Sequence, residues 1–146
     1  MLHAAINISR KTGIAYNGPR ILSQIALVTE DPGERKRALD EGEAILKSGA
    51  VGHNYFWYYR DVMEIALKFE DWTAAESNAQ ALEDFTRAEP LPWSEFFIAR
   101  GRALAAFGRG GRDAATIDAL RRLRDEAKRI GWNTALPALD EALKAA

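Results

Sequence analysis

Apolar residues recur at intervals of three and four positions along most of the chain, the spacing that places them on one face of an α-helix. The segment DWTAAESNAQALEDFTR, residues 71–87, shows this pattern, and its apolar stripe consists of Trp72, Ala75, Ala79, Leu82 and Phe85. Runs of β-branched residues, which favour strands, are absent, whereas Ala, Leu, Glu and Arg, which favour helices, dominate. The pattern therefore predicts an all-α protein.

Local signals set the expected helix boundaries. Asp31 and Asp71 can each cap the free N–H groups of a following helix. A proline suits the first turn of a helix because it has no N–H to satisfy, so we expect the second helix to open at Gly18-Pro19. Pro90 and Pro92 prevent a helix from continuing through residues 89–92. We expect helices over residues 2–11, 18–28, 32–48, 52–70, 71–87 and from 92 or 94 to 107, then one ending at 130 and one over 134–144.

A degenerate repeat links three of these helices. Ala38, Ala75 and Ala115 are spaced 37 and 40 residues apart, and each is followed four positions later by a small residue, namely Gly42, Ala79 and Ala119. Small residues at this spacing allow two helices to approach closely, and tetratricopeptide repeats use such positions with a period of about 34 residues. We therefore expect one domain over residues 1–146, a tetratricopeptide-like α-solenoid of about three antiparallel helical hairpins plus a C-terminal capping helix.

Two stretches carry a resemblance to a known family, GHNYFWYYRDVMEIALKFEDWTAAE and LEDFTRAEPLPWSEFFIARGRALAAFG. They resemble the C-terminal helical-repeat region of large bacterial signalling proteins, in which a class III adenylate or guanylate cyclase domain and an ATPase domain precede the repeats. The likeness covers roughly residues 14–130 and implies that the chain is a C-terminal fragment. The chain contains neither a cyclase domain nor a G-x4-GK[ST] phosphate loop, so those activities do not carry over.

The composition is that of an ordinary globular domain, with 47% hydrophobic and 28% charged residues in 146. No apolar run is long enough to cross a bilayer, and the N-terminus lacks the features of a signal peptide. The absence of cysteine fits a reducing compartment. We therefore expect a cytoplasmic protein that does not contact a membrane.

The net charge of −1 argues against a protein that coats nucleic acid, but the charge is unevenly distributed. Residues 51–95 contain three basic and nine acidic side chains, whereas residues 96–146 contain ten basic and six acidic ones. This layout can steer a partner or a second copy, although solvated helix faces explain it more simply. One helix face contains Arg121, Arg124 and Lys128. Interleaved acidic residues favour intrahelical pairing over phosphate binding there.

The chain contains no motif for catalysis or metal binding. Its two histidines, His3 and His53, are fifty residues apart, and there is no cysteine. Asp61 and Glu64 share a helix face, but Arg60 and Glu64 also have the spacing of a surface ion pair. We therefore expect no cofactor and no enzymatic activity.

Five consecutive aromatic residues, 55–59, extend around a whole helix, so they cannot all face one core. We expect most of them to pack between hairpins. Some side chains of this helix should instead point into the concave groove that such repeats present, where Trp and Arg residues contribute strongly to binding. The predicted groove consists of Trp57, Arg60 and Glu64, with Ile98 and Arg102 at matching places in the next repeat.

These observations favour a non-catalytic module for protein–protein interaction or intramolecular docking. Its partner would be a protein or peptide, or the preceding domains of the same chain. Self-association is a further option, because an N-terminal hairpin without a cap leaves an apolar face open. The alternative is a regulatory domain that senses a small molecule in an enclosed apolar pocket.

Overall fold

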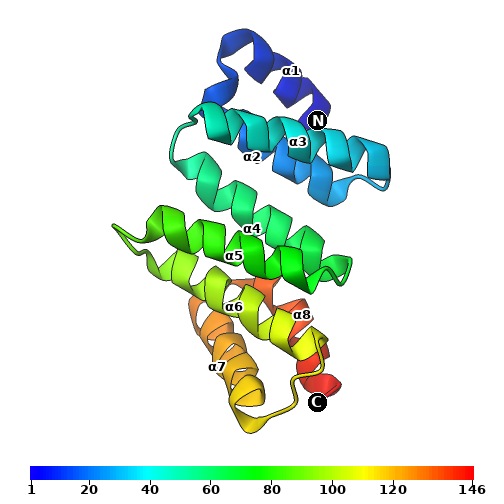
Figure 1. Cartoon of the computed structure of the whole chain (residues 1–146), viewed down its shortest axis with the longest axis vertical. Helices are drawn as coiled ribbons and strands as arrows, with labels where there is room; N and C mark the ends of the chain where they lie inside the picture. The colour runs from blue at the N-terminus through cyan, green and yellow to red at the C-terminus, as the bar shows by residue number, and fades with distance from the viewer. The chain divides into compact units, whose positions relative to one another are not determined.

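A computed structural model describes all 146 residues and contains eight α-helices, one short 3-10 helix and no strand, which confirms the all-α prediction (Figure 1). The Cα positions divide the chain into two compact units, Met1–Ile65 and Ala66–Ala146, and α4 runs across the boundary between them. None of the helices combines the length and the apolar character that crossing a bilayer requires. The elements are α1 (Leu2–Thr12), α2 (Ile14–Val28), α3 (Pro32–Ser48), α4 (His53–Lys68), α5 (Trp72–Thr86), α6 (Pro92–Gly108), α7 (Ala114–Ile130), η1 (Asn133–Ala135) and α8 (Leu136–Lys144).

Both predicted aspartate caps are confirmed. The Asp31 carboxylate accepts a hydrogen bond of 2.8 Å from the Gly33 N–H at the start of α3, and Asp71 accepts one of 2.9 Å from the Ala74 N–H at the start of α5. Asp113, for which no cap was predicted, caps α7 in the same way. These helices begin where a carboxylate satisfies N–H groups that have no partner inside the helix.

The expected start of the second helix at Gly18-Pro19 is wrong. Helix α2 already begins at Ile14, only Gly13 separates it from α1, and Pro19 lies inside it. Proline cannot donate to the carbonyl four residues earlier, so the Ala15 carbonyl loses its helical partner. The backbone N–H of Val51, at 3.0 Å, donates to this carbonyl instead.

The side chain of Asn54 forms hydrogen bonds with the other backbone groups that Pro19 leaves without helical partners. It is fully buried, and its Oδ1 accepts a hydrogen bond of 3.2 Å from the Arg20 N–H. Its Nδ2 donates to the carbonyls of Tyr16 at 2.9 Å, Val51 at 3.0 Å and Ala15 at 3.3 Å. A tertiary contact from α4 therefore permits a proline in the body of α2, which the local rule does not anticipate.

In the first unit, α1 packs on α2 and α2 packs on α3 around an apolar core. The close approach expected at Gly42 is confirmed, since a Cβ atom there would lie 2.6 Å from Cε2 of Tyr58. Tyr58 is buried, and its hydroxyl donates to the Leu39 carbonyl at 2.8 Å. The core cluster consists of Ile6, Leu22, Ile25, Ala26, Ala38 and Ile65.

In the second unit, α5 packs on α6, α6 on α7 and α7 on α8. Ala75 and Ala79 are fully buried in α5, as the repeat predicts. The prediction that Ala115 and Ala119 form the third close helix contact of the repeat is wrong, because Ala115 is exposed and Ala119 is only half-buried. Helix α7 buries its larger apolar side chains instead, together with one alanine, and this stripe consists of Leu120, Leu123 and Ala127.

We predict that Asn54→Ala lowers the free energy of unfolding by about 3 kcal/mol, because it leaves several buried backbone groups without partners. Urea unfolding followed by circular dichroism measures the change. The control is Asn78→Ala, since the Asn78 amide makes one hydrogen bond within its own helix, to the Ala74 carbonyl. Its effect should stay below about 1 kcal/mol.

A double-mutant cycle tests the cause. In a Pro19→Ala background the helix regains the missing N–H, so Asn54→Ala should cost about 1 kcal/mol less than in the wild type. Strict additivity of the two substitutions would contradict the proposed link between Pro19 and Asn54.

Candidate functional site

The five predicted groove residues divide between the two units. Trp57, Arg60 and Glu64 lie on the part of α4 that belongs to the first unit, and Ile98 and Arg102 lie on α6 in the second. Ile98 and Arg102 are one helical turn apart and line the same surface pocket, which has a volume of about 720 Å³.

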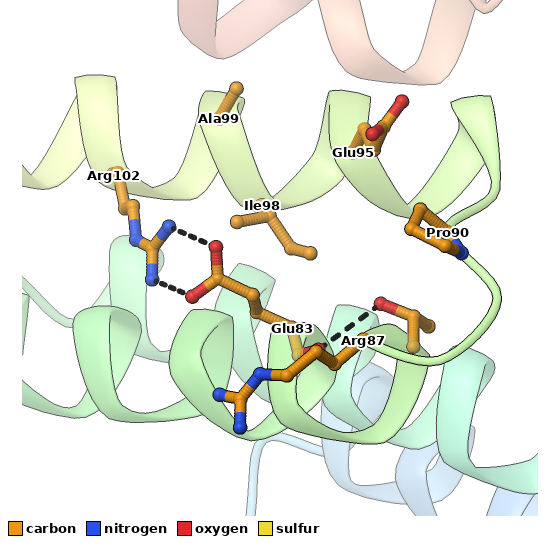
Figure 2. Close-up of a pocket in the computed structure, with 8 residues that line it drawn as sticks. Glu83, Arg87, Pro90, Glu95, Ile98, Ala99 and Arg102 are labelled. Carbon is orange, nitrogen blue, oxygen red and sulfur yellow. Dashed lines mark hydrogen bonds and ion pairs between the residues drawn. The ribbon is translucent and has the colours of Figure 1, made fainter.

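The pocket in the second unit lies along the seam between α5 and α6 and is open to solvent. Ile98 occupies its centre, the ion pair of Arg102 with Glu83 lies at one end, and Pro90 lies at the other (Figure 2). Its remaining lining residues are Thr86, Arg87, Glu95 and Ala99. An apolar centre bordered by charged side chains suits a side chain that is apolar along its length and polar at its tip.

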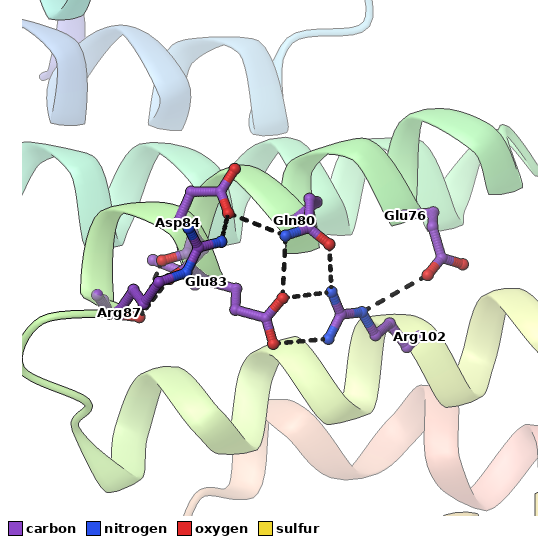
Figure 3. A network of polar contacts seen from close by, with 8 residues as sticks. Glu76, Gln80, Glu83, Asp84, Arg87 and Arg102 are labelled. Atoms are coloured by element: carbon purple, nitrogen blue, oxygen red, sulfur yellow. Dashed lines mark hydrogen bonds and ion pairs between the residues drawn. The ribbon is translucent and has the colours of Figure 1, made fainter.

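Arg102 joins α6 to successive polar positions on α5 (Figure 3). Its guanidinium forms a two-pronged contact with Glu83, with Nη1 at 3.1 Å from Oε1 and Nη2 at 2.9 Å from Oε2. Nη2 also donates to Gln80 Oε1 at 2.9 Å, and Nε lies 3.5 Å from a carboxylate oxygen of Glu76. Two parallel bonds between arginine and carboxylate fix a geometry as well as supplying energy, so this network holds the two walls of the pocket together.

The same contacts set the charges at the pocket. The hydrogen bond from Arg102 lowers the pKa of the Glu83 carboxyl, and the bond to Glu83 raises the pKa of Arg102. Arg87 is paired with Asp84, whereas the exposed Glu95 forms no ion pair. The one charged group of the pocket that is free to pair with a bound molecule is therefore the negative Glu95 carboxylate. Arg102 and Arg87 are already paired with carboxylates of α5.

In the first unit, Trp57 is half-buried between two cations. The guanidinium carbon of Arg20 lies 4.6 Å from the centroid of the Trp57 ring, and that of Arg60 lies 5.7 Å from it. Cation–π contacts of this kind hold an indole ring in one orientation. The predicted groove residues Trp57 and Arg60 thus contact each other, and Arg20 belongs to the same cluster.

Asp61, which the sequence places on the same helix face as Glu64, is fully buried. Arg60 Nη1 donates to Asp61 Oδ1 at 2.5 Å, and Ser23 Oγ, also fully buried, donates to Oδ2 at 2.7 Å. Burial raises the pKa of the Asp61 carboxyl, while the bonds from Ser23 and Arg60 oppose that shift. A signal was present in the sequence, because Asp61 lies three residues after Tyr58 and four before Ile65, so a large apolar side chain precedes and follows it on the same helix face.

The remaining candidate residues have local partners. His3 lies 2.7 Å from a carboxylate oxygen of Glu34, and His53 lies 2.9 Å from Oδ1 of Asn17. No group of three or more His, Cys, Asp or Glu side chains is arranged to hold a metal ion. In α7 the predicted intrahelical pairing is confirmed for two of the three basic residues, with the pairs Arg121–Asp118 and Arg124–Asp125.

Comparison with known proteins gave no relative. The chain matches no protein-family model, no curated protein and no solved structure.

The buried carboxyl of Asp61 makes the stability of the protein pH-dependent. Its pKa in the folded state lies above the ordinary value of 3.8, so the folded protein binds this proton more tightly than the unfolded chain does. The contribution of Asp61 is therefore greatest below pH 3.8 and is lost as the pH rises through the folded pKa. We predict that the free energy of unfolding of the wild type, relative to Asp61→Asn, falls over this window, as urea unfolding at several pH values measures.

Asp113→Asn provides a control of opposite sign. Hydrogen bonds from Thr116 lower the pKa of the Asp113 carboxyl, so its contribution is present above pH 3.8 and is lost as the pH falls. A wild-type advantage over Asp61→Asn that stays constant, or that grows with pH, would contradict the raised pKa of Asp61.

Proposed function

We propose that the chain is a non-catalytic binding module that takes up a segment of a protein partner in the pocket between α5 and α6. One observation carries this proposal. Ile98 lies at the centre of an open pocket of about 720 Å³ that is bordered by charged side chains. Pockets for small molecules enclose most of their ligand, whereas a shallow seam between two helices suits a side chain that projects from a larger partner.

The scaffold in this proposal is a tetratricopeptide-like α-solenoid of helical hairpins with α8 as the capping helix. Its support is the packing of successive helices on one another in each unit, and the burial of small residues at repeat positions such as Gly42, Ala75 and Ala79. Such scaffolds present helix-lined surfaces to partners. A place in a cyclase–ATPase signalling protein of the bacterial cytoplasm remains a hypothesis that rests on the resemblance described above.

The chemistry of the pocket indicates the chemistry of the bound segment. The exposed Pro90 offers an apolar contact, Ile98 is only 6% exposed, and the free carboxylate nearby belongs to Glu95. Residues 72–108, which form α5, α6 and their connection, contain five acidic and three basic side chains, so the surroundings are also negative. The proposed partner segment therefore presents an apolar side chain next to a basic one.

A blocking substitution tests this proposal. Ala99 is exposed and lines the pocket, so Ala99→Arg adds bulk and positive charge without disturbing the core. A displayed library of random peptides selected on the purified chain should yield segments that combine apolar and basic residues. We predict that Ala99→Arg weakens their binding at least tenfold, as isothermal titration calorimetry measures (tenfold is about 1.4 kcal/mol).

The matched control is Ala44→Arg, at another exposed alanine within a helix that lines none of the pockets described here. It should leave binding unchanged. A library without enriched binders, or binders that tolerate Ala99→Arg, would show that the pocket is not the binding site.

A further inference from the structure

Helix α1 presents an exposed isoleucine one turn away from an unpaired lysine. Ile8 is 62% exposed, and the exposed Lys11 follows it by three positions, so the two side chains are neighbours on the helix surface. Lys11 forms no ion pair within the chain. The chain itself therefore contains the combination of apolar and basic side chains that the pocket between α5 and α6 is proposed to bind.

The other exposed apolar side chains within helices lack a free basic neighbour. Tyr16 lies one turn before Arg20, but the guanidinium carbon of Arg20 already lies 4.6 Å from the centroid of the Trp57 ring. The remaining three have an acidic residue, and no basic one, three or four positions away, and they are Val28, Phe85 and Ile130. Among the helices, α1 thus offers the exposed apolar side chain that lies beside an unengaged cation.

The pocket offers a complementary pair at the same spacing. Ala99 and Glu95 both line it, both are exposed, and they are four positions apart on α6. Residues three or four positions apart on a helix have Cβ atoms about 5–6 Å apart, so each pair spans one turn. With α1 antiparallel to α6, Ile8 would lie over the small Ala99 side chain. Lys11 would then reach the Glu95 carboxylate.

We propose that the segment bound in this pocket is α1 of a second copy of the chain. Ile8 of that copy covers Ala99. Its Lys11 pairs with Glu95. The inference rests on the proposed binding function of the pocket and names the partner. The contact is heterologous, because α1 of one copy meets the pocket of another, so every chain contains both halves of it.

Charge supports both the partner and the orientation of α1. Its last turn contains Arg10 and Lys11, and its first turn contains no acidic residue, whereas the surroundings of the pocket are negative. The parallel orientation would place Lys11 beside Arg102, a like-charge contact. The antiparallel orientation places it beside Glu95, the free carboxylate of the pocket. Opposite charges therefore meet in the antiparallel orientation.

Charge exchange tests this geometry. Sedimentation equilibrium of the full chain should show concentration-dependent association. Lys11→Glu and Glu95→Lys each bring like charges together, so each should raise the dissociation constant about tenfold. The double variant Lys11→Glu/Glu95→Lys restores a pair of opposite charges, and its dissociation constant should return to within about threefold of the wild type. A wild-type chain that stays monomeric at about 1 mM would overturn the proposal, as would a double variant as weak as the single ones.

A mixing experiment tests whether the contact joins two different surfaces. Ile8→Glu retains the pocket, and Ala99→Arg retains α1, so each variant alone should associate at least tenfold more weakly than the wild type. An equimolar mixture should nevertheless form a complex of one copy of each, with a dissociation constant within about threefold of the wild type. Circular dichroism confirms that both variants are folded. A mixture that associates no better than its components would contradict the heterologous contact.

Two matched controls should associate like the wild type. Val28→Glu changes an apolar side chain that is as exposed as Ile8 and lies on the neighbouring helix, and Lys144→Glu reverses an exposed lysine in α8. Weaker association in either control would count against the assigned contact.

Calorimetry with the selected peptides separates this inference from the proposed function. Peptides whose binding is weakened by Ala99→Arg, on a chain that does not associate with itself, would overturn the second copy as partner and leave the function of the pocket in place. If Ala99→Arg weakens neither peptide binding nor self-association, both proposals are wrong.

Discussion

The first unit depends on how a proline in the middle of a helix is accommodated. Pro19 removes a donor from α2, and the Asn54 side chain enters the gap with one acceptor and two donor hydrogens. This contact fixes the start of α4 against α2. The next turns of the same face of α4 then bring Tyr58 over Gly42 and Asp61 to Ser23. A shift of α4 by one turn would leave all of these polar groups buried without partners, so together they specify a single register.

The buried face of α4 also determines what the helix presents outside. Asp61 is held by Ser23 and in turn holds the guanidinium of Arg60. Arg60 and Arg20 contact the Trp57 ring, so a buried carboxylate orients the indole through an arginine. A change at Arg60 would therefore alter the packing of α4 and its surface at once. Trp57 and Arg60, which the sequence suggested as groove residues, therefore help to hold α4 in place within the first unit.

The sequence predicted features that neighbouring residues determine, and it failed where distant residues decide. The caps at Asp31 and Asp71 each depend on an N–H group two or three residues later, and both caps were predicted. The start of α2 was not, because the group that compensates for Pro19 comes from Asn54, 35 positions later. The repeat failed at Ala115 because spacing alone ignores size, and α7 buries leucines that lie elsewhere on the helix. In the pocket, Ile98 and Arg102 were predicted as neighbours, but the pairing of Arg102 with Glu83 was not.

The polar networks between α2 and α4 and between α5 and α6 differ in how well they tolerate substitution. Between α2 and α4 the polar groups are fully buried, so loss of one partner leaves another unsatisfied and destabilises the unit. Between α5 and α6 the charged groups are partly exposed, and water can replace a lost partner at small cost. A binding surface requires side chains that can be adapted to a partner without unfolding the scaffold. Ala99 and Glu95 meet this requirement, and Trp57 and Arg60 do not, which supports placing the proposed binding site in the pocket rather than on α4.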